Sequence, residues 1–483
     1  MRVASSHPAP APAAGELLGH PRGLYLLFGA EMWERMSFYG MRGLLVLYLT
    51  DVTRGGFGWS RADALSLYGW YTGLVYVTPL LGGWLADNVL GQRRAVVIGG
   101  LLMMIGHFLM AVPDLPEAYW LGLPRAAPLY LALAFIMAGN GLFKPNISVM
   151  VGQLYPPGDA RRDSGFTIFY MGINLGALLG ALVCGTLGER VGWAFGFGSA
   201  GVGMALGLAL FLWKARDLLG GIGLRKTDAD RAQIAAARAA AASQGTGGLT
   251  SVELQRIAVI LILSFFVIFF WAAFEQAGGL MTLYTDEKVD RHVGTFLIPT
   301  TWFNMVNSGL IVLLGPLFSA LWTGLAVRRL DPPIPLKMAL GLVLMSLGFV
   351  FMLGASEQAD AAGKSALGWV VAAYAFHTMG ELCLSPVGLS MVTKLAPARL
   401  ASLLMGIWFL STAIANKLAG VIGSQAEEFG EFTVFLGIVL ATGAAGIVLA
   451  ALSPVLVRMM HGADQKTVEP VPPVPAAVPG GPA

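Results

Sequence analysis

A stripe of charged side chains near the start of the chain could carry proton-linked chemistry. Positions 31 to 42 read EMWERMSFYGMR, in which Glu31, Glu34, Arg35 and Arg42 recur at the spacing of one helical face, with Tyr39 at its edge. Carboxylates beside cations change their proton affinity when an ion pair breaks. The stripe therefore predicts a proton-linked switch, and a buried ion network that only fixes packing is the alternative.

Isolated polar residues also interrupt later apolar runs. Lys144 falls in the middle of one run, just before a proline, Asn174 lies in another, and Glu275 and Glu381 each stand in a further run. A lysine that snorkels to a membrane surface would lie near a helix end instead. Because a charge within an apolar helix is costly, the charged members of this set are candidate functional groups.

The composition indicates that these groups belong to a membrane protein. Of the 483 residues, 56% are hydrophobic and 12% are charged, and the mean hydropathy is +0.69, whereas about 25% of residues are charged in soluble domains. This excludes an ordinary soluble enzyme, a nucleic-acid-binding domain and a disordered protein. Cys184 and Cys383 lie in apolar runs and indicate neither a disulfide framework nor a metal site. We expect no cofactor apart from protons as the coupling ion, and no nucleic-acid partner.

Long apolar runs predict the elements that position these residues. Each run is long enough for the roughly 20 residues of a membrane-spanning helix, and too uniformly apolar for the alternating strands of a membrane barrel. The twelve predicted spans are 23–50, 63–87, 95–113, 127–153, 164–188, 191–213, 257–284, 296–325, 335–354, 367–393, 401–423 and 432–457.

Lysine and arginine are distributed unequally between the predicted loops. If both termini are cytoplasmic, the cytoplasmic segments carry 20 of these residues and the opposite side carries 7, which has the sign of the positive-inside rule. An odd number of spans would not preserve this unequal distribution of basic residues. We therefore expect a multi-pass protein of a bacterial-type cytoplasmic (inner) membrane, with both termini in the cytoplasm.

A polar segment divides the spans into two halves. It is basic and rich in alanine, and residues 228–244 predict an interfacial helix, whereas the Pro-rich C-terminal tail predicts disorder. The predicted organisation is a cytoplasmic tail at 1–21, a six-helix bundle at 22–213, a cytoplasmic linker at 214–256, a second six-helix bundle at 257–460 and a disordered tail at 461–483.

The loop after the second span resembles the signature loop of the major facilitator superfamily. Residues 83–94 read GWLADNVLGQRR and fit the form G-x-x-x-D-x-x-x-G-x-[RK]-[RK]. The equivalent loop of the second half keeps the basic pair Arg328-Arg329 but lacks the glycines and the aspartate, as a degenerate copy in two parallel repeats would. The resemblance implies the major facilitator fold, an all-α membrane protein with twelve transmembrane helices in two six-helix bundles.

The polar segments resemble, more narrowly, the proton-dependent oligopeptide transporter (POT/PTR) family of that superfamily. Residues 31–40 follow E-x-x-E-R-F-x-Y-Y-G except at Met36 and Phe38, and residues 169–176 follow F-Y-x-x-I-N-x-G. Residues 141–146 are similar to G-x-F-K-P-N and place Lys144 where the family lysine stands. Members with two extra helices between the halves would have fourteen spans, but the 214–256 segment is too short and too polar for them.

The resemblance implies which side chains meet the substrate. The substrate-binding residues would be Arg35, Tyr39, Tyr76, Lys144, Asn174, Trp271, Asn307, Glu381, Ser385 and Trp408. Arg35 and Lys144 would bind the C-terminal carboxylate of a peptide, and Glu381 would bind its free amino group. In the empty carrier we expect Lys144 to pair with Glu381. His377, one turn before Glu381, is either a modulator of that carboxylate or an ordinary packed histidine.

The resemblance also implies a coupling network and an activity. The proton-coupling residues would be Glu31, Glu34, Arg35, Arg42, Lys144 and Glu275, with Glu275 paired to Arg42. The implied protein is a monomeric symporter, not an enzyme, that imports di- and tripeptides and peptide-like molecules across the lipid bilayer with protons by alternating access. A carrier of nitrate or another anion is one alternative, and an intramembrane enzyme or lipid-handling protein is the other, although the sequence offers neither HExxH nor paired metal ligands.

Overall fold

Residues at the N-terminal ends of α2, α9 and α12 favour the start of a helix there. Ser60 accepts a hydrogen bond from the backbone N–H of Asp63 at the start of α2. Thr250 and Glu253 form a reciprocal capping box at the start of α9. Pro335 stands in the first turn of α12, where its missing N–H removes no helical hydrogen bond.

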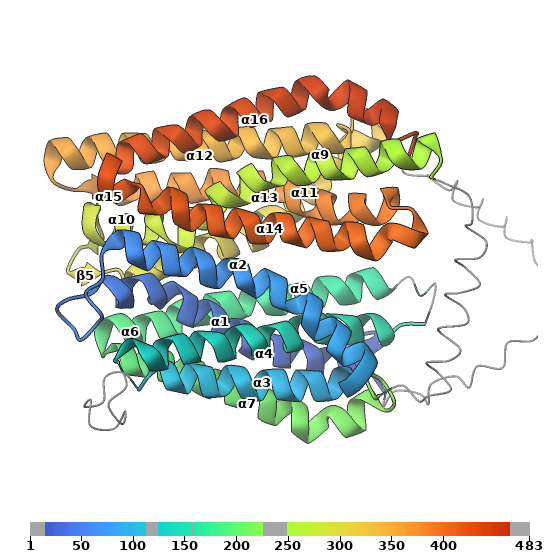
Figure 1. Ribbon diagram of the computed structural model, residues 1–483, viewed down its shortest axis with the longest axis horizontal. Helices are drawn as coiled ribbons and strands as arrows, with labels where there is room; N and C mark the ends of the chain where they lie inside the picture. The colour runs from blue at the N-terminus through green and yellow to red at the C-terminus, as the bar shows by residue number, and fades with distance from the viewer. Residues whose placement is uncertain (1–14, 113–123, 157–158, 160, 226–248, 464–483) are drawn as a thin grey trace, which may run out of the picture.

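The computed structural model describes residues 15–112, 124–156, 159, 161–225 and 249–463. Its two halves lie side by side, the first in blue to green and the second in yellow-green to red (Figure 1). The first half contains α1 (Arg22–Thr50), α2 (Arg61–Leu85), α3 (Gln92–Met110), α4 (Ala126–Gln153), α5 (Arg161–Leu179), which continues through the π-helical turn η3 (Gly180–Gly185) into α6 (Thr186–Arg190), and α7 (Trp193–Leu219).

The second half repeats this architecture. It contains α9 (Ser251–Phe274), which continues through the 3₁₀ turn η4 (Glu275–Gly278) into α10 (Leu280–Lys288), then α11 (Asn304–Val327), α12 (Ile334–Ala362), α13 (Leu367–Leu395), α14 (Ala401–Ser424) and α16 (Glu431–Met459). Each half of the described chain thus provides six long helical segments, as the sequence predicts. The helices extend beyond many of the predicted spans, for example to Ala362 in α12.

Ten of the described helical segments are long and apolar enough to cross a membrane by length and composition alone. The other two of the twelve are α1 and α2. Every 18-residue stretch of α1 contains at least three charged residues, and α2 is rich in glycine and tyrosine. Both of these helices are in the first half, and α1 carries the charged stripe.

Short elements order the loops between the long helices. Strand β1 (Glu16–Leu17) pairs antiparallel with β2 (His20–Pro21), β3 (Val289–Asp290) pairs parallel with β6 (Ser365–Ala366), and β4 (His292–Val293) pairs antiparallel with β5 (Phe296–Leu297). The remaining turns are η1 (Ala86–Leu90), η5 (Thr300–Phe303), η6 (Ala398–Leu400) and α15 (Ala426–Phe429). The predicted interfacial helix at 228–244 and most of the Pro-rich tail lie outside the described residues.

The halves pack against each other along α2 and α14. A Cβ atom on Gly69 of α2 would lie 2.8 Å from the Cα of Gly420 in α14, and one on Gly420 would lie 2.5 Å from the backbone oxygen of Leu65. Only glycine allows the two backbones to come this close, which is the usual role of small residues between membrane helices. The facing walls of the halves are consequently close enough to enclose a common site.

Candidate functional site

A cavity of about 310 Å³ lies between the halves, which is within the range of small-molecule binding sites. Its lining includes ten of the fourteen residues that the sequence implicates, namely Arg35, Tyr39, Arg42, Tyr76, Lys144, Asn174, Trp271, Glu275, Asn307 and Glu381. The first six come from the first half and the other four from the second. Of the remaining four residues, Glu31 and Glu34 contact Arg35, whereas Ser385 and Trp408 do not line the cavity.

Arg35 holds the charged stripe of α1 together. Its Nε lies 3.1 Å from Oε1 of Glu31 and also contacts Oε2 of Glu34. The guanidinium lies over the rings of Phe38 and Tyr39, 5.3 and 5.8 Å from their centroids. Arg35 and both carboxylates are at most 1% exposed. The predicted stripe is thus a buried cluster in which two carboxylates share one guanidinium.

Lys144 is a cation that faces the cavity from α4. Its Nζ lies 5.0 Å from the centroid of the Tyr76 ring of α2, a cation–π arrangement. Among the described side chains, no carboxylate forms an ion pair with it, so the expected bridge to Glu381 is not formed in this structure. Lys144 is therefore available to an anionic ligand.

Glu381 faces the same cavity from α13. Its Oε2 accepts a hydrogen bond of 3.0 Å from Nδ2 of Asn307 in α11, which also donates to Thr378 at 3.1 Å. One turn before Thr378 on α13, the hydroxyl of Tyr374 donates to Oδ1 of Asn304 at 3.3 Å. This part of the second-half wall is thus built from polar residues of α11 and α13 around Glu381.

Arg42 and Glu275 connect the two walls. Nη2 of Arg42 contacts Oε2 of Glu275, and Nε of Arg42 donates to the Tyr68 hydroxyl at 2.6 Å. The pairing that the family resemblance implies is therefore present. It joins α1 to η4, so any separation of the halves at this level must break a largely buried ion pair.

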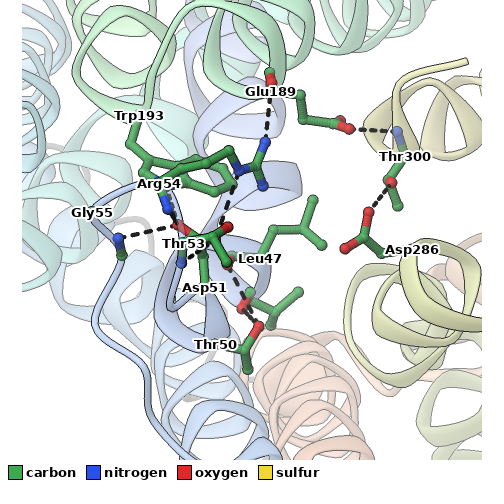
Figure 2. Close-up of polar contacts among 12 residues, drawn as sticks. Leu47, Thr50, Asp51, Thr53, Arg54, Gly55, Glu189, Trp193, Asp286 and Thr300 are labelled. Carbon is green, nitrogen blue, oxygen red and sulfur yellow. Dashed lines mark hydrogen bonds and ion pairs between the residues drawn. The ribbon is translucent and has the colours of Figure 1, made fainter. Parts of the chain in front are cut away.

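Further contacts between the halves lie at one end of the molecule, where α15, α10 and β5 are seen in Figure 1; we call it the latched end. The carboxylate of Glu189 in α6 accepts hydrogen bonds from the backbone N–H groups of Thr300 and Thr301, at 2.7 and 2.8 Å, and so caps η5 (Figure 2). Arg61 of α2 pairs with Glu431 of α16 at 2.7 Å. An anionic side chain at a helix N-terminus is stabilising, so Glu189 holds the halves together there.

The loop after α1 is ordered around Asp51 at the same end. Its carboxylate accepts hydrogen bonds from Nε1 of Trp193 at 2.9 Å and from the hydroxyl and backbone N–H of Thr53 (Figure 2). Burial alone would raise the pKa of Asp51, but these hydrogen bonds outweigh burial and lower the pKa to about 2. Arg54, in the same loop, donates to the backbone oxygen of Glu189 at 3.0 Å. The loop therefore supports the element that carries the Glu189 cap.

Ser385 and Trp408 lie away from the cavity. Trp408 is 6% exposed, and its ring occupies the space beside Gly388, where a Cβ atom would lie 2.4 Å from it. The Ser385 hydroxyl is buried, with no hydrogen-bond partner among the described residues. The absence of a side chain at Gly388 lets the tryptophan pack against α13 instead of facing the cavity.

His377 is a packed residue on the side of α13 that meets α12. Its ring lies 4.6 Å from the Phe349 ring, centroid to centroid, and its two nitrogens have no hydrogen-bond partner among the described residues. A Cβ atom on Gly348 would lie 2.3 Å from the ring. This geometry favours the reading of His377 as a packed histidine.

The cavity also contains residues that we did not anticipate. They are Tyr170, Thr301, Asn304 and Tyr374, among others. Tyr374 precedes Glu381 by seven residues, so helical spacing from the carboxylate is a signal that could have identified it. Thr301 carries no comparable signal. No group of three His, Cys, Asp or Glu side chains that could hold a metal ion occurs in the described part of the chain.

Comparisons with known proteins agree with this geometry. The family model of the POT family matches residues 93–216 and 235–438. The chain is 37% identical to an uncharacterized transporter of Bacillus subtilis, over 92% of this chain and 96% of the relative. It is 36% identical to a peptide transporter of Yersinia enterocolitica, over 86% and 90% of the two chains.

A solved structure has the same fold. The crystal structure of a mutant POT peptide transporter in complex with alafosfalin superposes with a TM-score of 0.82 at 36% identity, covering 94% of this chain and 98% of that one. The family match, the curated relatives and the fold agree along most of the chain. The chain therefore belongs to the POT family, the proton-dependent oligopeptide transporters of the major facilitator superfamily.

Proposed function

We propose that the protein is a symporter that imports di- and tripeptides together with protons across a bacterial-type inner membrane. One observation carries this proposal: Lys144 and Glu381, neither of which has an oppositely charged partner among the described residues, face one cavity from opposite halves. A short peptide is a zwitterion with fixed ends and variable side chains. Opposite charges on opposite walls recognise both ends and leave the middle permissive.

The cavity wall from the first half binds the carboxylate of the peptide through Arg35 and Lys144. On the opposite wall, Glu381 and Asn307 bind the amino group of the peptide. Tyr39, Tyr76 and Asn174 serve the peptide backbone, and Trp271 shapes a side-chain pocket. Ser385 and Trp408 take part only if α13 and α14 rearrange during transport.

Proton coupling runs through the carboxylates that share cations with the site. Glu31 and Glu34 compete for Arg35, which also faces the cavity, so peptide binding changes the charge that those carboxylates experience. Protonation of Glu275 releases Arg42 and removes an ion pair between the halves. Substrate and proton thereby act on the same equilibrium, as linkage requires.

The moving units are the bundles at 22–213 and 257–460, joined by the linker at 214–256, with tails at 1–21 and 461–483. Both termini and the linker are cytoplasmic, as the basic loops indicate. The latched end then faces outward, so this structure is a carrier closed on the outside. The protein works as a monomer, since one chain forms both walls of the cavity.

Uptake by proteoliposomes tests the proposal. A labelled dipeptide should accumulate under an inwardly directed proton gradient, and a protonophore should abolish the accumulation. Labelled nitrate, supplied under the same gradient, tests the carriage of a simple anion. Accumulation of nitrate but not of dipeptide would show that the protein transports anions and not peptides. Dipeptide uptake that reaches equilibrium without accumulation under the gradient would contradict proton coupling.

A further inference from the structure

Three buried polar atoms around the charged stripe of α1 have no hydrogen-bond partner among the described residues. They are Oε2 of Glu31, Nη2 of Arg35 and Oδ1 of Asn140. All three residues are at most 1% exposed. An unsatisfied polar atom in a dry interior is costly, so its presence in a site that must exchange a proton requires an explanation.

Asn140 is the member of this group that comes from another helix. It lies on α4, one turn before Lys144, and its Nδ2 donates to Oε1 of Glu34 at 3.2 Å. Glu34 therefore has one donor on each carboxylate oxygen, since its Oε2 contacts Arg35. The ionised form of Glu34 is satisfied in this arrangement.

Two glycines hold Asn140 in place. A Cβ atom on Gly139 would lie 2.5 Å from the backbone oxygen of Gly99 in α3, and one on Gly141 would lie 2.7 Å from the Cβ of Thr78 in α2. The helix α4 is thus in close contact with both neighbours on either side of Asn140. The backbone position of Asn140 is consequently fixed, and its side chain remains within reach of α1.

An amide differs from the other neighbours of Glu34 because it both donates and accepts. When Glu34 is ionised, Nδ2 donates to it, as observed. When a proton arrives, the resulting acid O–H needs an acceptor, and Arg35, the other described side chain hydrogen-bonded to the Glu34 carboxylate, has none to offer. Rotation of the Asn140 amide about its last torsion presents Oδ1, which is unpaired here. Either protonation state can thus be satisfied without water.

We propose that Asn140 is a positioning residue for proton transfer, which stabilises Glu34 in both its ionised and its protonated form. This rests on the proposed proton coupling and names the group through which the coupling passes. The charged and titratable groups that surround Glu34 are Glu31, Arg35 and Tyr39 of α1, Tyr71 of α2 and Lys144 of α4. Asn140 is an amide that contacts Glu34 directly, and it does not line the substrate cavity.

The test compares Asn140→Leu with wild type in proteoliposomes that contain equal amounts of folded protein. Two rates are measured for a labelled dipeptide, namely uptake driven by a proton gradient and counterflow exchange, which requires no net proton movement. Loss of a hydrogen bond to a charged group predicts a fall of about ten-fold or more in driven uptake, with counterflow retained. Asn140→Asp should recover driven uptake at acidic pH, because a protonated aspartate again donates and accepts.

Asn146→Leu is the matched control. Asn146 is also a buried asparagine of α4, but among the described residues its amide donates to the backbone oxygens of Leu142 and Gly82 and to no carboxylate. This variant should lower the two rates in proportion, if it lowers either. Normal driven uptake by Asn140→Leu, or an equal loss of both rates, would overturn the inference. If dipeptide uptake by the wild-type protein does not depend on the proton gradient, the proposed coupling is overturned, and the inference with it.

Discussion

Asn307 of α11 donates a 3.0 Å hydrogen bond to Glu381 of α13, and no cation of the described residues pairs with that carboxylate. One neutral donor leaves most of the acceptor capacity of a carboxylate unused. We therefore propose that Glu381 binds the ammonium group of a ligand, since no cation of the described residues pairs with it. Lys144, a cation on the opposite wall that forms no ion pair with the described residues, is its counterpart.

Lys144→Ala should abolish gradient-driven uptake, because it removes a cation that faces the cavity without an ion-pair partner among the described residues. Arg35→Ala should do the same, since two buried carboxylates would lose their shared partner. Initial rates of dipeptide uptake in proteoliposomes measure both effects. Lys417→Ala is a matched control, because Lys417 is a membrane-helix lysine that lies over the Trp70 ring outside the cavity. Driven uptake that survives in either cavity variant would remove that residue from the mechanism.

Glu189→Gln should weaken the latched end, because a neutral amide caps η5 less well than a carboxylate does. In a protein without its native cysteines, a cysteine placed at Ala177, which lines the cavity, reports access from outside. We expect an impermeant thiol reagent to label it about five-fold faster in the variant, as the loss of a charged hydrogen bond would allow.

Glu428→Gln is the control for that experiment, because Glu428 is an exposed residue of α15 at the same end. Equal labelling rates in Glu189→Gln and in the control would show that the cap does not hold the outer side closed.

Asp51→Asn should lower the melting temperature by about 3 °C through loss of charged hydrogen bonds in the loop after α1. The pKa of Asp51 in the folded protein, about 2, is below its usual value. Its contribution to stability is therefore complete above roughly pH 4 and disappears as the pH falls through about 2. Thermal unfolding in detergent should show a constant difference between variant and wild type from about pH 5 to about pH 8. A difference that vanishes within that window would contradict the assignment.

Cysteines introduced next to Arg161 and next to Ser251 should resist an impermeant thiol reagent added to intact cells, because both positions are predicted to be cytoplasmic. A cysteine next to Glu428, at the latched end, should react under the same conditions and serves as the positive control. The opposite labelling pattern would reverse the assignment of the membrane sides.

Local spacing explains which parts of the site could be predicted from the sequence. Glu31 and Arg35 are four residues apart on one helix, so their ion pair follows from helical geometry. Arg35, Lys144, Glu275 and Glu381 stand out as charges within apolar helices, whereas Tyr76, Trp271 and Asn307 were supplied by the family resemblance. Twelve spans and two halves follow from hydropathy and from the loop charges alone.

Contacts between distant elements explain what could not be predicted. Glu189 and Thr300 are 111 residues apart, and nothing near either residue identifies the other. Trp408 and Ser385 were assigned to the site by the family resemblance, but the rotation of each helix is set by packing, such as the space beside Gly388. Asn140 is visible in the sequence, yet its contact with Glu34 depends on how closely α4 approaches its neighbours.

The most direct test of the account measures how Glu381→Gln affects the binding of two ligands, a free dipeptide and its N-acetylated form. Competition binding to purified wild type and variant gives four affinities. If Glu381 binds the amino group, the variant should lose about ten-fold or more in affinity for the free dipeptide and little for the acetylated one. Equal losses for the two ligands would contradict the claim that the second half of the cavity recognises the amino end of a peptide.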